Sequence, residues 1–130
     1  MTVAATCENQ QKADQRLPIL LSLPIRHREV VCEPMLEGID LTAHLQTGKL
    51  ECVIAGGESG PEARLCRYEW ITDLARQCEK VGVPFTFKQT GAHFEKDGRV
   101  YNIPRGQQHE QAKRAGISTK RKIYEEEEPL

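Results

Sequence analysis

Four short apolar segments, each followed directly by polar residues, dominate the hydrophobic pattern of this 130-residue chain. They cover residues 3–6, 28–32, 50–55 and 84–87, and each has the length of a strand rather than a helix. The third is the most continuous apolar run, which is typical of a strand buried on both faces of a parallel sheet. Pro34 cannot continue a central strand and therefore sets the end of the second segment. The pattern predicts four strands.

The segments between these strands have the spacing of helices. The clearest helix is predicted over 67–81, where apolar residues recur at intervals of three and four and Gly82 supplies the stop. Residues 8–16 predict a polar helix, and 17–23 a separate apolar helical segment, because Pro18 either breaks a helix or begins a new turn. Residues 39–45 predict a short helix or turn, with Asp40 or Thr42 as its cap.

Strands and helices therefore alternate, which predicts an α/β protein with a parallel sheet of about four βα units. Right-handed crossovers place the carboxyl ends of all four strands at one edge, where ligands bind in such folds. The polar residues at these ends form the candidate ligand-binding set: Glu8, Asn9, Glu33, Gly56, Gly57, Glu58, Ser59, Gly60, Arg64, Lys88 and Gln89.

The pattern weakens beyond Gly91. Residues 95–102 predict a small hairpin around the turn pair Asp97-Gly98, and 107–115 predict a basic helix ended by Gly116. We therefore expect an α/β domain over 1–92, a basic hairpin and helix extension packed on it over 93–122, and an acidic disordered tail over 123–130.

Charge is unevenly distributed although the net charge is only −1. Between residues 99 and 122, seven Lys or Arg stand against the single acidic residue Glu110, a local charge of +6. Such a stretch is either a solvated surface or a contact for nucleic acid or phosphate.

The five cysteines have neither zinc spacing nor an evident disulfide pattern. Cys52 and Cys78 fall on predicted apolar faces and are expected to be buried, whereas Cys7 and Cys32 fall at predicted strand ends near the candidate site. No apolar run has the length of a membrane helix and no signal peptide is visible, so we expect a cytoplasmic protein without a membrane partner.

The loop over 56–61 is the strongest local motif. Its glycines permit a tight turn and let a ligand approach backbone N–H groups, which can hold a carboxylate or phosphate, while Glu58 can hold an ammonium group. The alternative is a plain strand-to-helix turn that uses glycine for geometry. The spacing is neither the dinucleotide fingerprint nor a Walker loop.

The charged residues at the other strand ends can also be interpreted either as ligand-binding groups or as structural ones. Glu33 suits metal binding, proton transfer or a hydrogen bond to a ligand amine, or it is a structural partner of a backbone group or of Lys88. Lys88 can hold an anion or pair with Glu33 or Glu58. Arg64 can clamp an anion with two hydrogen bonds, or it lies on the surface. The four histidines are scattered and form no metal-ligand pattern.

Taken together, the motifs resemble those of a known family. The chain is similar to the C-terminal half of a phage and prophage family of radical-S-adenosylmethionine-like proteins of unknown function. The segments that carry the resemblance are 7–10 with 13–18, 32–35 with 38–41, 53–60 with Arg64, then Trp70, Cys78 and 84–91, and in one branch 103–105 with 108–117.

The resemblance implies half of a βα barrel whose strand-end residues bind a ligand, with S-adenosylmethionine as a candidate. Full-length members carry three closely spaced cysteines in an N-terminal half, and this chain has no such cluster. It therefore predicts no iron–sulfur cluster here and no catalysis by this chain alone. A half-barrel leaves open sheet edges, so we expect a homodimer or a partner that supplies the missing half.

Three functions are compatible with these expectations. The first is the ligand-binding half of a radical-S-adenosylmethionine-like enzyme that acts on or near nucleic acid, with an anionic or amine-bearing ligand. The second is a non-catalytic interaction protein, a degenerate remnant or a nucleic-acid-binding accessory protein that uses residues 99–122. The third is a small hydrolase with Glu33 as base.

Overall fold

The central element of the fold is a four-stranded parallel sheet. The computed structural model describes residues 1–119. The strands β1 (Thr2–Thr6), β2 (His27–Cys32), β3 (Cys52–Gly56) and β5 (Phe85–Gln89) pair in the order β1-β2-β3-β5, all parallel. The four predicted strands and their direction are confirmed, although β5 extends to include Lys88 and Gln89, which were expected to follow it.

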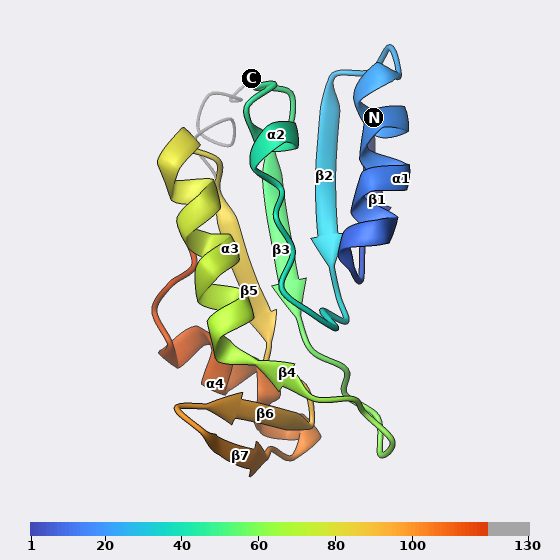
Figure 1. Cartoon of the computed structure of the whole chain (residues 1–130). Coiled ribbons are helices and arrows are strands. Elements are labelled where there is room, and N and C mark those ends of the chain that lie inside the picture. The colour runs from blue at the N-terminus through green and yellow to red at the C-terminus, as the bar shows by residue number, and fades with distance from the viewer. Residues whose placement is uncertain (120–130) are drawn as a thin grey trace.

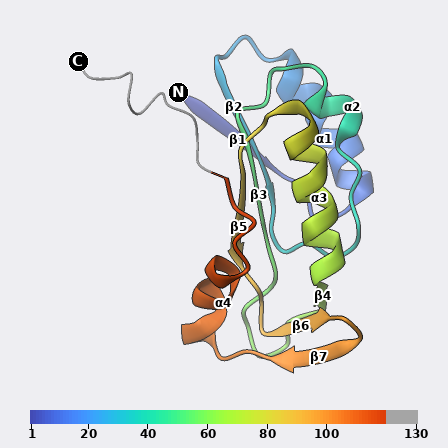
Figure 2. The same cartoon turned by 90° about the vertical axis from the view of Figure 1, so that its left-hand side faces the viewer.

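The helices between these strands lie together on one face of the sheet (Figure 2). They are α1 (Gln10–Ser22), α2 (Thr42–Leu45) and α3 (Tyr68–Val81). Each strand is added to the same side of its predecessor, so right-handed crossovers bring every connecting helix to the same face. The structure is an open α/β sheet with alternating strands and helices.

Helix α1 corrects one expectation. A break at Pro18 was predicted, but a single helix runs through this residue. Asn9 caps its start, since the side-chain oxygen accepts a hydrogen bond from Lys12 N at 2.8 Å. The buried residues Ala13, Leu17 and Leu20 recur at helical spacing on the sheet side, so packing of this face outweighs the hydrogen bond lost at proline.

The core lies between these helices and the sheet. Its largest fully buried side chains include Phe85, Leu17, Met35 and Leu74. Helix α3 contributes the predicted apolar stripe and ends at Gly82, whose φ of 72° suits the left-handed C-terminal cap. The opposite face of the sheet is not covered by helices α1–α3 (Figure 2). Cys52 is buried on this face, but many of its side chains are exposed or half-buried, among them Ala4, Glu29, Val31, Ile54, Thr86 and Lys88.

A second, three-stranded sheet was not predicted as such. Strand β4 (Cys66–Arg67) pairs in parallel with β6 (His93–Lys96), which pairs antiparallel with β7 (Arg99–Asn102). The hairpin around Asp97-Gly98 is confirmed, and both residues have positive φ, as a tight hairpin turn requires. Strand β4 has only two residues, too short to leave a periodic signal in the sequence.

Helix α4 (Gln108–Arg114) follows a short 3₁₀ turn, η1 (Arg105–Gln107), near the carboxyl ends of the strands (Figure 1). It joins the main sheet through Ala112, which is buried, and through Thr90 N, which donates to Gln108 O at 3.2 Å. A helix is therefore present where one was predicted over 107–115. The expected acidic tail, together with the basic residues 120–122, lies outside the described residues.

The two edges of the main sheet differ. Along β5, Phe85 N donates to Thr119 Oγ1 at 2.8 Å and Phe87 N donates to Ser118 Oγ at 2.9 Å. Thr119 N in turn donates to Phe85 O at 2.8 Å. Strand β1 pairs with β2 alone among the strands of residues 1–119. Within residues 1–119, one edge is thus covered by a further segment of the chain, whereas β1 has no such neighbouring segment on its outer side.

Candidate functional site

Three acid–base pairs lie at the carboxyl ends of the first three strands of the main sheet. Glu8 follows β1, Glu33 follows β2, and Glu58 lies in the loop after β3. Their cationic partners are Arg16, Lys88 and Arg64, at 3.4, 3.2 and 2.9 Å. All three carboxylates are between a fifth and a third exposed. The predicted convergence of polar side chains at one edge therefore includes a balanced row of charges.

Glu33 and Gln89 form the most enclosed part of this edge. Glu33 Oε1 accepts from Lys88 Nζ at 3.2 Å, and Oε2 accepts from Gln89 Nε2 at 2.8 Å. The Gln89 amide also donates to Gly57 O, and its oxygen accepts from Gly91 N at 2.7 Å. Gln89 is thus fully engaged in connecting the loops that follow β2, β3 and β5. Lys88, about half exposed, is the more available of the two strand-end residues.

The Glu58–Arg64 pair has the most specific geometry of the edge. Arg64 Nε donates to Glu58 Oε1 at 3.0 Å, and Nη2 donates to Oε2 at 2.9 Å. Arg64 N also donates to Oε1 at 3.0 Å. These hydrogen bonds from the Arg64 side chain and backbone lower the pKa of Glu58 to about 2. Glu58 is consequently a fixed anion at neutral pH, held in a two-pronged contact.

The remaining candidates have structural partners or lie in the loop. Asn9 caps α1, and Glu8 is bridged by Arg16, whose Nη1 also donates to Thr6 O. Ser59 and Gly60 are half-buried in the loop after β3, and a side-chain carbon placed at Gly60 would meet no atom within 4 Å. The loop therefore has free space near its tip rather than at its base.

The base of the glycine loop is packed against backbone. A side-chain carbon at Gly57 would lie 2.4 Å from Thr90 O and 2.9 Å from Gly91 Cα, and one at Gly56 would lie 3.2 Å from Glu33 Oε2. Gly57 N donates to Gln89 O at 3.1 Å. The two glycines thus let the loops after β3 and β5 touch, which is the geometric use of glycine, and the Gly57 N–H is already engaged.

The cysteines are buried and unreactive in character. Burial raises the pKa of Cys7 to about 11 and that of Cys66 and Cys78 to about 12, and it also raises the pKa of Cys32. The expected burial of Cys52 and Cys78 is confirmed. Cys7 and Cys32 do lie next to Glu8 and Glu33 in the chain, but both are fully buried behind the edge.

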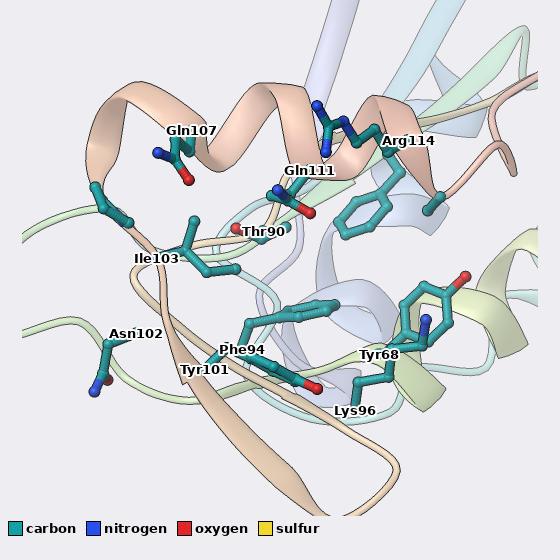
Figure 3. A pocket seen from close by; sticks show the side chains of 13 residues that line it. Tyr68, Thr90, Phe94, Lys96, Tyr101, Asn102, Ile103, Gln107, Gln111 and Arg114 are labelled. Carbon is teal, nitrogen blue, oxygen red and sulfur yellow. The ribbon is translucent and has the colours of Figure 1, made fainter.

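A cavity of about 540 Å³ lies beside this edge and was not predicted from the sequence. Figure 3 shows it between the β6–β7 hairpin and α4, with Phe94 and Tyr101 on one side and Gln111 and Arg114 on the other. Its walls come from segments that are distant in sequence, so no local pattern indicates it. The one sequence signal was the basic character of the hairpin and helix.

Across residues 1–119, no cluster of three or more His, Cys, Asp or Glu side chains is arranged to hold a metal ion. No helix in this described part of the chain has the length and apolar character needed to cross a membrane.

Comparison with known proteins gives a family but no activity. Neither the curated proteins nor the solved structures contain a match to this chain. One family model matches residues 1–127, nearly the whole sequence, and its description is "Protein of unknown function (DUF5131)". The chain therefore belongs to the family DUF5131, a family of unknown function.

Proposed function

We propose that this chain is a ligand-binding module whose carboxyl edge takes a small ligand with an amino-acid end, that is, an ammonium and a carboxylate group. The bidentate Glu58–Arg64 pair carries the proposal. Opposite charges of fixed geometry, side by side at the end of a parallel strand, match both groups of such a ligand.

Each charge of the pair has a distinct role. The Glu58 carboxylate, with a pKa near 2, is ionised at neutral pH and attracts the ligand ammonium group. The Glu58 contact occupies Nε and Nη2 of Arg64, so the guanidinium can receive the ligand carboxylate through Nη1. The half-exposed Lys88, already paired with Glu33, adds a second positive charge to the same edge.

The resemblance to phage radical-S-adenosylmethionine-like proteins makes S-adenosylmethionine the leading candidate. Glu58 and Arg64 fit its methionyl ammonium and carboxylate, and the open space around Gly60 leaves room at the loop tip. The Gly57 N–H is not part of this assignment because it is bonded to Gln89 O. When bound, S-adenosylmethionine supplies an electrophilic sulfonium centre; Glu58 and Arg64 contribute only its binding and orientation.

Titration calorimetry of the full chain tests this proposal. We expect S-adenosylmethionine and free methionine to bind and adenosine to bind much more weakly. Glu58→Gln removes the charge that holds the ammonium group and should weaken binding at least tenfold. Glu62→Gln, which removes an exposed carboxylate from the same loop, should leave affinity within twofold.

Two results would contradict the proposal. One is equal binding of adenosine and S-adenosylmethionine, which would show that the amino-acid end is not recognised. The other is a folded protein that binds none of the three compounds, which would favour the degenerate-remnant hypothesis.

We also propose that the chain associates with a second copy through β1. Five residues, Thr2–Thr6, form this strand without any charged residue or proline, the usual protection of an exposed edge. The half-buried Val31 and Ile54 on the neighbouring sheet face extend the apolar surface available to a partner.

A further inference from the structure

The cavity between the hairpin and α4 combines three kinds of side chain. Aromatic rings, side-chain amides and cations all line it, and within residues 1–119 no Asp or Glu belongs to the lining. Its volume of about 540 Å³ falls within the range of small-molecule sites. It is separate from the Glu58–Arg64 pair, neither of whose members lines it.

Aromatic rings form the inner wall. The rings of Tyr68, Phe87 and Phe94 lie with their centroids 5.8–6.3 Å apart. Tyr101 lies opposite Phe94 in the hairpin register, so both rings are on the same face of the hairpin, and Tyr101 is 40% exposed. An exposed ring next to a buried aromatic cluster is a platform on which a planar heterocycle can stack.

Cations lie at the two sides of this platform. Lys96 Nζ is 5.0 Å from the centroid of the Tyr68 ring, and Arg114 projects from α4 on the other side of the cavity (Figure 3). Arg99, whose guanidinium carbon lies 5.3 Å from the centroid of the Tyr101 ring, adds a third positive charge on the hairpin. The ion pair of Arg114 with Glu110 is long, at 3.7 Å, and both side chains are well exposed. This ion pair is therefore weak and leaves the Arg114 guanidinium accessible to a ligand. The local field therefore favours an anion.

Side-chain amides provide hydrogen-bonding groups between the rings and the cations. Gln107 and Gln111 line the cavity from η1 and α4, and neither side chain has a hydrogen-bond partner among residues 1–119. The neighbouring Gln108, by contrast, is buried and donates to Ile103 O at 3.0 Å. Two exposed amides, each with donors and an acceptor, can pair with the edge of a heterocyclic base.

We infer that this cavity binds a nucleotide, with its base stacked on Tyr101, its base edge facing Gln107 and Gln111, and its phosphate between Lys96 and Arg114. A planar base, a polar edge and an anionic phosphate are the three properties that the lining matches at once. The same chemistry is present in a free mononucleotide and in one unit of a single-stranded nucleic acid. The exposed Arg105 and Lys113 nearby would contact further phosphates of a strand.

Binding measurements with the full chain test the inference. The probes are the four ribonucleoside monophosphates and inorganic phosphate by calorimetry, and a fluorescein-labelled twelve-nucleotide single-stranded DNA by anisotropy. Tyr101→Ala should weaken nucleotide binding about tenfold or more, while Tyr101→Phe keeps the ring and should remain within twofold of wild type.

Charge variants test the phosphate contact. Lys96→Gln combined with Arg114→Gln should weaken binding and reduce its salt dependence. Lys49→Gln, an exposed cation before β3 at the opposite end of the sheet, is the matched control and should have no effect. Circular dichroism of each variant establishes that the fold is retained.

The outcomes separate the two sources of the ligand. Mononucleotide binding without a gain for the oligonucleotide identifies a free nucleotide, and binding of the oligonucleotide at least tenfold tighter identifies a single strand. The inference is overturned if no probe binds, if inorganic phosphate binds as tightly as the nucleotides, or if Tyr101→Ala and the double charge variant bind like wild type.

Discussion

At the residue scale, the edge of the sheet is defined by how its charges are paired. Glu58 accepts two hydrogen bonds from the Arg64 side chain and one from the Arg64 backbone N–H. Glu33 instead accepts one hydrogen bond from the Lys88 side chain and one from the Gln89 side-chain amide. Because the Glu58 carboxylate is stabilised in the folded chain, its pKa falls from 4.5 to about 2. Folding and protonation of this residue are therefore linked.

The linkage gives a pH dependence with a defined sign. A carboxyl group with a lowered folded pKa stabilises the fold above its unfolded pKa, and this contribution is lost as the pH falls. We expect the difference in melting temperature between wild type and Glu58→Gln to be largest near pH 6 and to shrink between about pH 4.5 and 2. A difference that stays constant over this window in calorimetric scans would show that Arg64 does not hold the carboxylate.

The sequence predicted which residues would meet at the edge, but not what each would contact. Glu33, Glu58 and Lys88 were found because polar residues after parallel strands converge on one side. The partnership of Glu58 with Arg64 depends on the path of the intervening loop, which has no periodic signal. Tyr101 and Gln111 were missed because they meet only through tertiary packing.

At the scale of elements, the contact between the loops after β3 and β5 holds the edge together. Gly57 and Gly91 pack so closely that a side-chain carbon on either would lie 2.9 Å from the Cα of the other, and Gly91 has a φ of 83°, which residues with side chains rarely adopt. This crossing positions Gln89, and through it Glu33, so the geometry of the edge depends on the absence of side chains at both glycines.

Alanine substitutions at two glycines of the loop after β3 test this close contact, because one glycine is tightly packed and the other faces open space. Gly57→Ala places a methyl group against the Thr90 carbonyl and should reduce the free energy of unfolding by about 2 kcal/mol. Gly60→Ala meets open space and should change it by less than about 0.5 kcal/mol. Urea denaturation measures both, and equal effects of the two variants would contradict the close approach of the loops.

Elements with long periodic patterns were predictable, and short or interrupted ones were not. Helix α3 carries an apolar stripe over its full length and ends at glycine, so its bounds were predicted to within one residue. Pro18 misled the interpretation of α1, because burial of Leu17 and Leu20 outweighs the local cost of proline. Strand β4 exists only through its pairing with β6.

At the scale of the whole molecule, the two edges of the main sheet differ in how they are covered, and the proposed association through β1 rests on this difference. Ser118 and Thr119 bond to β5 and cover that side. Strand β1 has no comparable cover among residues 1–119. A second copy that pairs along β1 would complete the backbone hydrogen bonds of both chains.

Light scattering after size exclusion tests this association. We expect wild type to be a dimer and Ala4→Lys, a charge on the exposed side of β1, to be a monomer. Thr86→Lys places the same charge on the same sheet face at the covered strand and should remain dimeric. Monomeric wild type at about 100 μM, or a dimeric Ala4→Lys variant, would contradict association through β1.

The pairing of β4 with β6 also decides how the hairpin is held in place. These two strands flank α3 and β5 in the chain, so their ladder joins positions that a whole helix and a strand separate. The β6–β7 turn is local in sequence, but the ladder with β4 anchors the hairpin to the start of α3. One wall of the aromatic cavity is therefore positioned by a contact between distant parts of the sequence, and not by the hairpin itself.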